Sequence, residues 1–551
     1  MPQISNFLIF CITVFIALTF TNAGLYLTDE LSPANQLHQL AEGHQLTYFE
    51  DKYGFYGDGT IDKYITNINY VMIYSLMLPV ISLPIFLILS LLPDIAGVLP
   101  LILWILILGY LILTFKERIS KMYIYCFLGI ITILNIIFYT KFNVNSLEVL
   151  SIVTTNVLLY GLFGVIIWKL ICHMFAEDKR IFMWIATMSC SSLLFWVGAL
   201  KDHVLVALLL IIILYTIIKF YDAGEIKYLL YTAVASGLIV WERPELSITI
   251  IPMVCLLILY KKFYAKPLIV YGIITLLCTI PSLLNNYIVT GSIFKFPLQA
   301  VKQTIGGAHL SSSSNAIDIL LHEIPTYIMI NFSNLSIGNI IGIMIHPFNG
   351  GIGVLPIIMP AIFTIIFLPY LIYIKKIRVS NPEKILFIFS IAITVSYFCI
   401  SALGFNLHAE TGMLPDMRLF SLIYAPITIA SLSVISRSYN LNYKIMLQRV
   451  VISIGIVLFI FVSMLMFTSN IITSLNINFV ANCIGFIIFA ISIAGIVNIK
   501  LNRIDELEII IPIMVALPLV WQILVSVITT KLYNYPMYIP LIELIKQIVF
   551  G

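Results

Sequence analysis

The sequence carries little charge for its length, and this absence excludes most classes of soluble protein. Of its 551 residues, 10% are Asp, Glu, Lys or Arg and 61% are hydrophobic, whereas soluble domains average about 25% charged residues. The net charge of +4 is too small on so apolar a chain to indicate nucleic-acid binding. The eight cysteines form no Cys-x-x-Cys pair and nearly all lie in apolar runs, so they predict no disulfide framework. The composition predicts an all-α, polytopic membrane protein.

The sequence also lacks the basic start of a cleaved signal peptide. Residues 21–24 (Thr-Asn-Ala-Gly) are a poor cleavage site, so we expect the first apolar segment to remain as an anchor. A spanning helix needs about 20 mostly apolar residues, and the sequence predicts about 13–16 of them. The candidate spans are 7–24, 96–115, 122–139, 148–171, 181–199, 202–219, 228–241, 246–260, 267–288, 353–374, 384–403, 419–435, 450–468, 479–498 and 507–529.

Lysine and arginine orient these spans, because cytoplasmic loops carry an excess of both. Basic clusters at 116–121, 261–266 and 375–384 mark three cytoplasmic loops. In this orientation most acidic residues and nearly all histidines fall on the opposite side, where two long loops lie, residues 25–95 and 289–352. We therefore expect a plasma-membrane protein whose polar, site-bearing face is extracytoplasmic.

One further apolar run, residues 69–92, does not fit this alternation as a span. Pro79 and Pro84 interrupt it, and proline costs a helix interior roughly 3 kcal/mol. If the run crossed the membrane, the loop before it would lie in the cytoplasm. We interpret the run as a juxtamembrane or re-entrant hairpin on the outer side.

Two adjacent carboxylates, Asp29 and Glu30, stand at the outer end of the first apolar segment and open a polar stretch that runs to about residue 68. Ionised groups are costly near hydrocarbon, so a carboxylate at the rim of a membrane is a candidate functional residue. The plainer interpretation is that the pair marks the place where the lipid ends. Position alone leaves both interpretations open.

Five stretches on the predicted outer face resemble, in their order, motifs of the C-type glycosyltransferase (GT-C) superfamily. The resemblance is to its membrane transferases related to protein O-mannosyltransferases and lipid A aminoarabinose transferase. The stretches are 27–30 (LTDE) with 36–43 (QLHQLAEG), 200–203 (LKDH), 237–245 (GLIVWERPE), 286–294 (NYIVTGSIF) with 347–356, and 414–420 (LPDMRLF). The sequence departs from the family pattern at Glu242, where relatives often have a neutral residue, at Ile293, and at Asp416-Met417, where glycine is common.

The resemblance implies a transferase that moves a sugar from a polyprenyl-phosphate donor to a hydroxyl of a glycan, lipid or protein acceptor. It assigns Asp29 as the base and Glu30 as a second positioning carboxylate, and direct displacement would invert the anomeric centre. A general base contributes about 10²–10⁴-fold, and cations stabilise the leaving phosphate. The candidate phosphate-binding residues are Arg243, Arg418 and Lys201, and the candidate substrate-binding residues are His44, Asp202 and His346.

Each of these residues also has a structural interpretation. Arg243 lies between Glu242 and Glu245 and is as well suited to a structural ion pair, and Arg418 lies near Asp416. Lys201 is placed to extend to the membrane interface. Asp202 suits the N-cap of the following span.

The histidines are weaker candidates still. His44 fits a solvated loop, and His346 a loop boundary. A divalent metal bound by His38 and His44 is not favoured, because no tight ligand spacing supports it. We therefore expect no cofactor.

The sequence predicts a catalytic membrane module over residues 1–290, which includes the outer loop 25–95, then the outer loop 291–352, and C-terminal helices over 353–551. Two other functions remain open. A lipid-linked polysaccharide ligase or polymerase would use arginines in a long late outer loop. A secondary transporter would show inverted repeats and charged groups near the membrane midplane, and no repeat is visible in the sequence.

Overall fold

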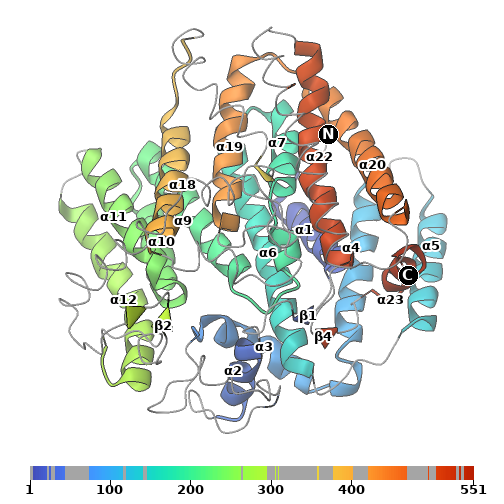
Figure 1. The fold of residues 1–551 in the computed structure, drawn as a ribbon, viewed down its shortest axis with the longest axis horizontal. Helices are drawn as coiled ribbons and strands as arrows, with labels where there is room; N and C mark the ends of the chain where they lie inside the picture. Colours follow the sequence, from blue (N-terminus) through green and yellow to red (C-terminus); the bar gives the residue numbers. More distant parts are fainter. Residues whose placement is uncertain are drawn as a thin grey trace.

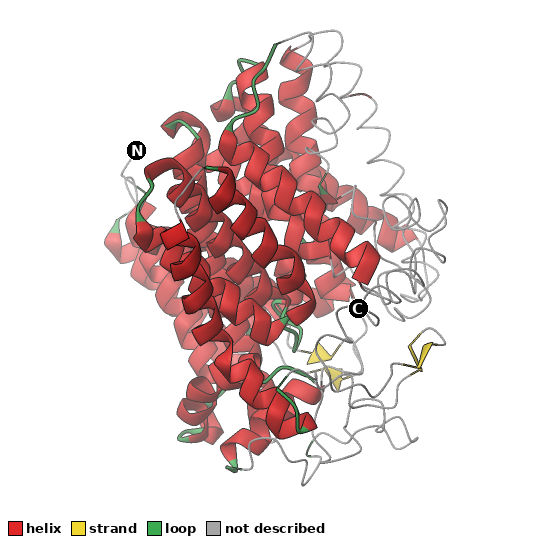
Figure 2. Cartoon of the chain, turned by 90° about the vertical axis from the view of Figure 1, so that its left-hand side faces the viewer, coloured by secondary structure: helices red, strands yellow, loops and turns green. Residues whose placement is uncertain are grey.

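The protein is a bundle of helices in a computed structural model, and the all-α prediction is confirmed (Figure 2). The structure describes residues 4–21, 24–25, 31–43, 52, 74–115, 120–139, 146–261, 265–293, 304–305, 308–309, 357–358, 376–400, 420–467, 494, 504–528, 533–534 and 539–550. The strands described are two short antiparallel pairs. They are β1 (Gly24–Leu25) with β4 (Tyr533–Asn534), and β2 (Thr304–Ile305) with β3 (Ala308–His309).

The helices follow the apolar runs of the sequence closely. They are α1 (Asn6–Phe20), α2 (Leu31–Ala41), α3 (Met77–Ser90), η3 (Pro93–Ile95), α4 (Val98–Phe115), α5 (Lys121–Ile137), α6 (Leu147–Met174), α7 (Glu177–Ser189), α8 (Leu193–Trp196), α9 (His203–Ala223), α10 (Ile226–Glu242), α11 (Pro244–Tyr260), α12 (Ala265–Thr290), α18 (Asn381–Ile400), α19 (Ser421–Ser438), α20 (Tyr443–Phe467), α22 (Ile504–Ile528) and α23 (Pro540–Phe550).

Within the described ranges, six helices are long and apolar enough to cross a membrane: α4, α6, α9, α12, α20 and α22. The shorter apolar helices α1, α3, α5 and α11 accompany them. The chain is therefore a multi-pass membrane protein, as predicted. The predicted spans 353–374 and 479–498 lie almost wholly outside the described residues.

The length of the helix in the run 69–92 is consistent with the interpretation that this run does not span the membrane, whereas the span predicted for 181–199 is interrupted. In the run 69–92, α3 has 14 residues, about 21 Å of helix, which is too short for a hydrocarbon core of about 30 Å. The single span predicted for 181–199 is wrong, because α7 ends at Ser189 and only the short α8 follows. Serines explain the break: the hydroxyl of Ser191 accepts a hydrogen bond from the Leu193 amide at 3.1 Å, which competes with helical bonding.

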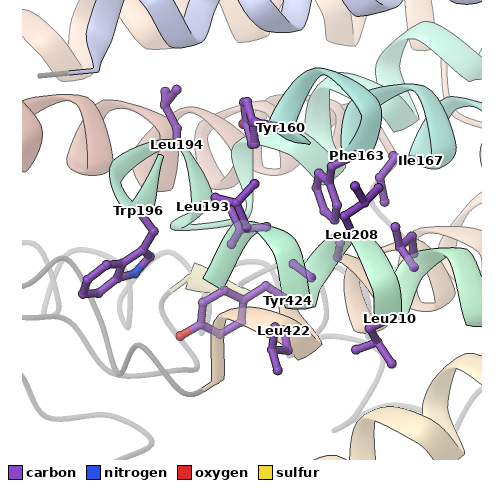
Figure 3. Packing of buried hydrophobic residues seen from close by; sticks show 14 of the residues in the cluster. Tyr160, Phe163, Ile167, Leu193, Leu194, Trp196, Leu208, Leu210, Leu422 and Tyr424 are labelled. Carbon is purple, nitrogen blue, oxygen red and sulfur yellow. The ribbon is translucent and has the colours of Figure 1, made fainter. Parts of the chain in front are cut away.

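The core lies where α1, α6, α9 and α19 pack together, around large buried side chains such as Trp196 and Tyr424 (Figure 3). Glycines let α1 approach α6 closely. A Cβ at Gly164 would lie 2.4 Å from Thr13 Oγ1, and one at Gly161 would lie 2.6 Å from the Phe10 ring. These glycines fix the distance between the first helix and the centre of the bundle.

The bundle has two ends with different side chains. At the end predicted to face outward, here called the outer end, α6 and α9 begin and α10 ends. The helices α2 and α3 lie across this end, at the bottom of Figure 1. At the opposite or inner end, basic residues of the predicted cytoplasmic side join neighbouring helices: Lys179 donates to the Ser436 carbonyl at 3.1 Å, and Arg437 pairs with Glu383.

Candidate functional site

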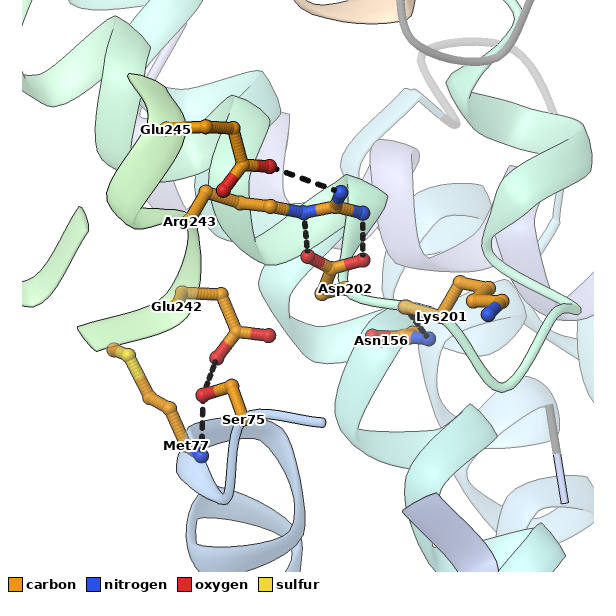
Figure 4. Close-up of polar contacts among 8 residues, drawn as sticks. All are labelled: Ser75, Met77, Asn156, Lys201, Asp202, Glu242, Arg243 and Glu245. Atoms are coloured by element: carbon orange, nitrogen blue, oxygen red, sulfur yellow. Dashed lines mark hydrogen bonds and ion pairs between the residues drawn. The ribbon is translucent and has the colours of Figure 1, made fainter. Parts of the chain in front are cut away.

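A forked ion pair between Arg243 and Asp202 is the centre of the polar cluster at the outer end (Figure 4). Arg243 is the residue between α10 and α11, with φ −138° and ψ 77°. Pro244, the first residue of α11, favours this extended conformation before it. Arg243 Nη2 donates to Asp202 Oδ1 at 2.7 Å and Nε donates to Oδ2. The pair therefore joins the break between α10 and α11 to the start of α9.

Asp202 occupies the N-cap position of α9 without capping the helix, because its carboxylate bonds Arg243 instead. Burial alone would raise the pKa of Asp202. The charge and hydrogen bonds of Arg243 outweigh burial and hold that pKa at about 2. Asp202 is therefore ionised at neutral pH, and its role in the described structure is to orient the guanidinium.

The ion pair with Asp202 occupies one edge of the Arg243 guanidinium. Asp202 takes the edge formed by Nε and Nη2, whereas Nη1 meets Glu245 Oε1 only at 3.4 Å, a long contact. A guanidinium has five N–H donors, and the Arg243 side chain remains 24% exposed. Among the described contacts, the Nη1 side of Arg243 is therefore paired less tightly than the edge that Asp202 binds.

Glu242 ties the end of the first outer loop to α10. Its side chain is only 7% exposed, and Oε2 accepts a hydrogen bond from the Ser75 hydroxyl at 2.8 Å. The same hydroxyl accepts from the Met77 amide at the start of α3, at 3.2 Å. Glu242 is the last residue of α10, beyond the apolar segment. Burial, and then the negative charge of Asp202, raise its pKa to about 8.

Lys201 adds a second cation beside the ion pair. It is 6% exposed, and its Nζ lies 5.0 Å from the centre of the Tyr74 ring, a cation–π contact. Asn156 of α6 donates to the carbonyls of Ala199 at 3.0 Å and Lys201 at 3.2 Å. Figure 4 shows Asp202 between Arg243 and Lys201. The turn before α9 is thus fixed from one side by α6 and from the other by Arg243.

The structure brings together three residues predicted from the sequence: Lys201, Asp202 and Arg243. The other predicted residues lie outside the described residues; they are Asp29, Glu30, His44, His346 and Arg418. Sequence reasoning assigned no role to Ser75 or Asn156. The available signal for Asn156 was an amide within an otherwise apolar span, because polar groups in spans are rare and often functional.

A second cluster at the outer end is formed by Glu148, Lys52 and His38. Glu148, in the first turn of α6, is fully buried. Its carboxylate accepts hydrogen bonds from Lys52 Nζ at 2.9 and 3.1 Å, and His38 Nδ1 of α2 lies 3.1 Å from Oε1. His38, for which metal binding is not favoured from the sequence, contacts a carboxylate in the structure. Within the ranges that the structure describes, no group of three or more His, Cys, Asp or Glu is arranged to hold a metal ion.

The sequence matches no protein-family model and no curated protein. Among solved structures, the chain is similar to ArnT from Cupriavidus metallidurans bound to undecaprenyl phosphate. The identity is 10%, the overlap covers 95% of this chain and 76% of that one, and the TM-score is 0.45. It is also similar to ArnT from the same organism in the apo state, with 11% identity, 94% and 74% coverage and a TM-score of 0.42. An overlap at this level leaves the substrate and the chemistry to be argued from the residues themselves.

Proposed function

We propose that the protein is a membrane glycosyltransferase of GT-C type. It transfers a hexosyl or pentosyl group from a polyprenyl-phosphate donor to an acceptor hydroxyl at the extracytoplasmic face of the plasma membrane. The observation that carries the proposal is the pair of cations, Arg243 and Lys201, on either side of Asp202 at the outer end. Their position agrees with the order of outer-face motifs that resemble this superfamily.

The two cations suit the leaving phosphate of such a donor. As the glycosidic bond breaks, negative charge grows on the phosphate, and donors that are already oriented stabilise it without reorganisation. Asp202 fixes one edge of Arg243, and the Nη1 side, where Glu245 makes only a long contact of 3.4 Å, is the side proposed to bind phosphate oxygens. Lys201 supplies a second positive charge, and Arg418 is proposed to supply a third. The polyprenyl tail remains in the lipid around the apolar helices.

The acid pair supplies the proton chemistry of the proposed reaction. Asp29 accepts the proton of the acceptor hydroxyl as that oxygen attacks the anomeric carbon, and the phosphate leaves from the opposite side, so the configuration inverts. Glu30 positions the acceptor or the sugar, and His44 and His346 bind hydroxyl groups of the substrates. The phosphate bond of the donor already activates the sugar, so the proposed reaction needs no cofactor.

The distribution of charge favours a transferase over a transporter. A secondary transporter binds its substrate and coupling ions near the bilayer midplane. The ion pairs among the described residues lie within about two turns of a helix end, as Arg243–Asp202 and Arg437–Glu383 do. This arrangement supports chemistry at a membrane face.

Two measurements on the purified full-length protein in lipid nanodiscs test the proposal. Undecaprenyl phosphate should bind, and undecaprenol, which lacks the phosphate, should bind far more weakly, as judged by native mass spectrometry. Incubation with polyprenyl-phosphate-linked hexoses and pentoses and the envelope glycans as acceptors should release polyprenyl phosphate. The double substitution Asp29→Asn and Glu30→Gln should abolish release while donor binding persists. Transfer that survives in this double variant would rule out the mechanism.

A further inference from the structure

Glu148 is fully buried, and two residues of the first outer loop help to offset the cost of burying its carboxylate. Its side chain is 0% exposed, and moving a carboxylate out of water costs several kcal/mol unless partners compensate for the lost hydration. The described partners, Lys52 and His38, both belong to the loop 25–95, whereas Glu148 belongs to α6. Docking of this loop on α6 therefore stabilises the buried carboxylate.

The docked segment connects directly to the residues of the proposed reaction. The helix α2, which carries His38, begins at Leu31, the residue covalently joined to Glu30. On the same helix, Gln36 Nε2 donates to the Tyr74 carbonyl at 2.9 Å. The Tyr74 ring in turn lies against Lys201. A continuous series of contacts thus runs from Glu148 through α2 to a cation of the candidate phosphate site.

We infer that Glu148 is a positioning residue that holds α2 on α6 through Lys52 and His38, and so aligns the acid pair with the cations of the donor site. The inference rests on the proposed function for its catalytic consequence. The attachment of α2 to α6 by the Glu148 carboxylate does not depend on the proposed function. Glu148 itself touches no substrate in this scheme.

The test is a double-substitution cycle with Glu148→Gln and Lys52→Met in the full-length protein in nanodiscs. Hydrogen exchange of the amides of α2 reports on the attachment, and exchange of α20 amides, at the far side of the bundle, is the reference. Glu148→Gln should speed α2 exchange about tenfold or more, because a charge-assisted interaction is lost. Lys52→Met removes the lysine cation from the buried carboxylate and should act more strongly, about 10²–10³-fold.

Adding Glu148→Gln to Lys52→Met removes the buried carboxylate that has lost its lysine, so the double variant should exchange more slowly than Lys52→Met alone. Glu148→Asp, which keeps the charge on a shorter side chain, should give an intermediate rate and serves where Glu148→Gln does not fold.

In the transfer assay kcat should fall about 10–100-fold in Glu148→Gln, with the donor KM within about twofold of wild type. Glu177→Gln, at an exposed acid in the first turn of α7, should change neither quantity.

The possible failures separate the two proposals. Unchanged α2 exchange in Glu148→Gln, or additive effects of the two substitutions, would overturn the attachment. Equal acceleration in α2 and α20 would assign Glu148 to global stability and would likewise overturn it. A shift in donor KM with kcat unchanged would overturn the alignment of the acid pair. Absence of transfer in the wild-type protein would overturn the proposed function, whereas a coupled exchange cycle would still support the attachment of α2.

Discussion

The two ends of the bundle use buried acids for different purposes. At the inner end, Glu383 of α18 pairs with Arg437 of α19, and Glu508 of α22 pairs with Arg449 of α20, so each acid joins one helix to a neighbouring helix. At the outer end, Glu148 and Glu242 bind residues of the first loop. The inner contacts join helices of the bundle to one another, whereas the outer contacts attach the first loop, with its helix α2, to α6 and α10.

The acids at the two ends also differ in whether they accept a hydrogen bond from a backbone amide at the start of their own helix. Glu383 lies in the first turn of α18, and its Oε2 accepts from the Ser380 amide at 2.7 Å as well as from Arg437, an arrangement that also caps the helix. Asp202 stands at the N-cap of α9 and gives its carboxylate to Arg243 instead. Asp202 thus forgoes a favourable cap, worth about 1 kcal/mol, to orient an arginine, which agrees with the role proposed for Arg243.

Removing one arginine from each end gives the largest expected contrast. Arg243→Met should lower kcat/KM of transfer about 10²–10³-fold, because an oriented donor to the developing charge is lost. Arg437→Met should leave kcat/KM per folded molecule unchanged. It should lower stability by roughly 1–3 kcal/mol, less than for a fully buried pair because Arg437 is 39% exposed. Transfer kinetics and thermal unfolding on the same samples measure both. The contrast is lost if Arg437→Met reduces kcat/KM as much as Arg243→Met does.

Two lysines provide a smaller and closely matched comparison, because each lies over a tyrosine ring. Lys201 is 5.0 Å from the Tyr74 ring at the outer end, and Lys179 is 5.3 Å from the Tyr443 ring at the inner end. Lys201→Met should raise the donor KM about 10–100-fold, the effect of losing a charge-assisted bond to phosphate. Lys179→Met should cost about 0.5–1 kcal/mol of stability without changing KM. An unchanged KM in Lys201→Met would show that this lysine extends to the interface and does not bind the donor.

The sequence predicted the helices well because apolar runs of sufficient length determine them. The bounds of α9 and α12 differ from the predicted spans by a few residues. The error at 181–199 arose from serines whose side chains compete with backbone bonding, which a hydropathy pattern does not register.

The sequence predicted that three residues of the candidate site, Lys201, Asp202 and Arg243, lie at the outer end. The prediction was possible because each of them is next to the end of an apolar run. Their pairing was not predictable, since Asp202 and Arg243 are 41 residues apart and Arg243 has nearer carboxylates. The contact of Glu148 with Lys52 spans 96 residues and depends on the docking of a loop. No local pattern contains that information, so the anchoring residues were missed whereas the charged residues at span ends were found.

The smallest expected effect concerns the pH dependence of the outer end. The pKa of Glu242 is raised to about 8 from its ordinary value of 4.5, so between these values the folded protein holds a proton that the unfolded chain releases. Stability therefore falls as pH rises through this window. Asp202, with its pKa lowered from 3.8 to about 2, acts in the opposite direction and only at acid pH, where its contribution is lost as pH falls through that range.

Glu242→Gln keeps an acceptor for Ser75 and removes the titration. Its melting temperature should exceed that of wild type by a few degrees at pH 8 and by less at pH 5, measured by thermal unfolding in nanodiscs, with Glu177→Gln as the control. If the melting temperatures of wild type and Glu242→Gln change in parallel with pH, Glu242 is ionised throughout this range. Glu242 would then add a further negative charge to Asp202 and Glu245 beside the single guanidinium of Arg243, and an outer end with that charge would bind a phosphate less well than the proposed function requires.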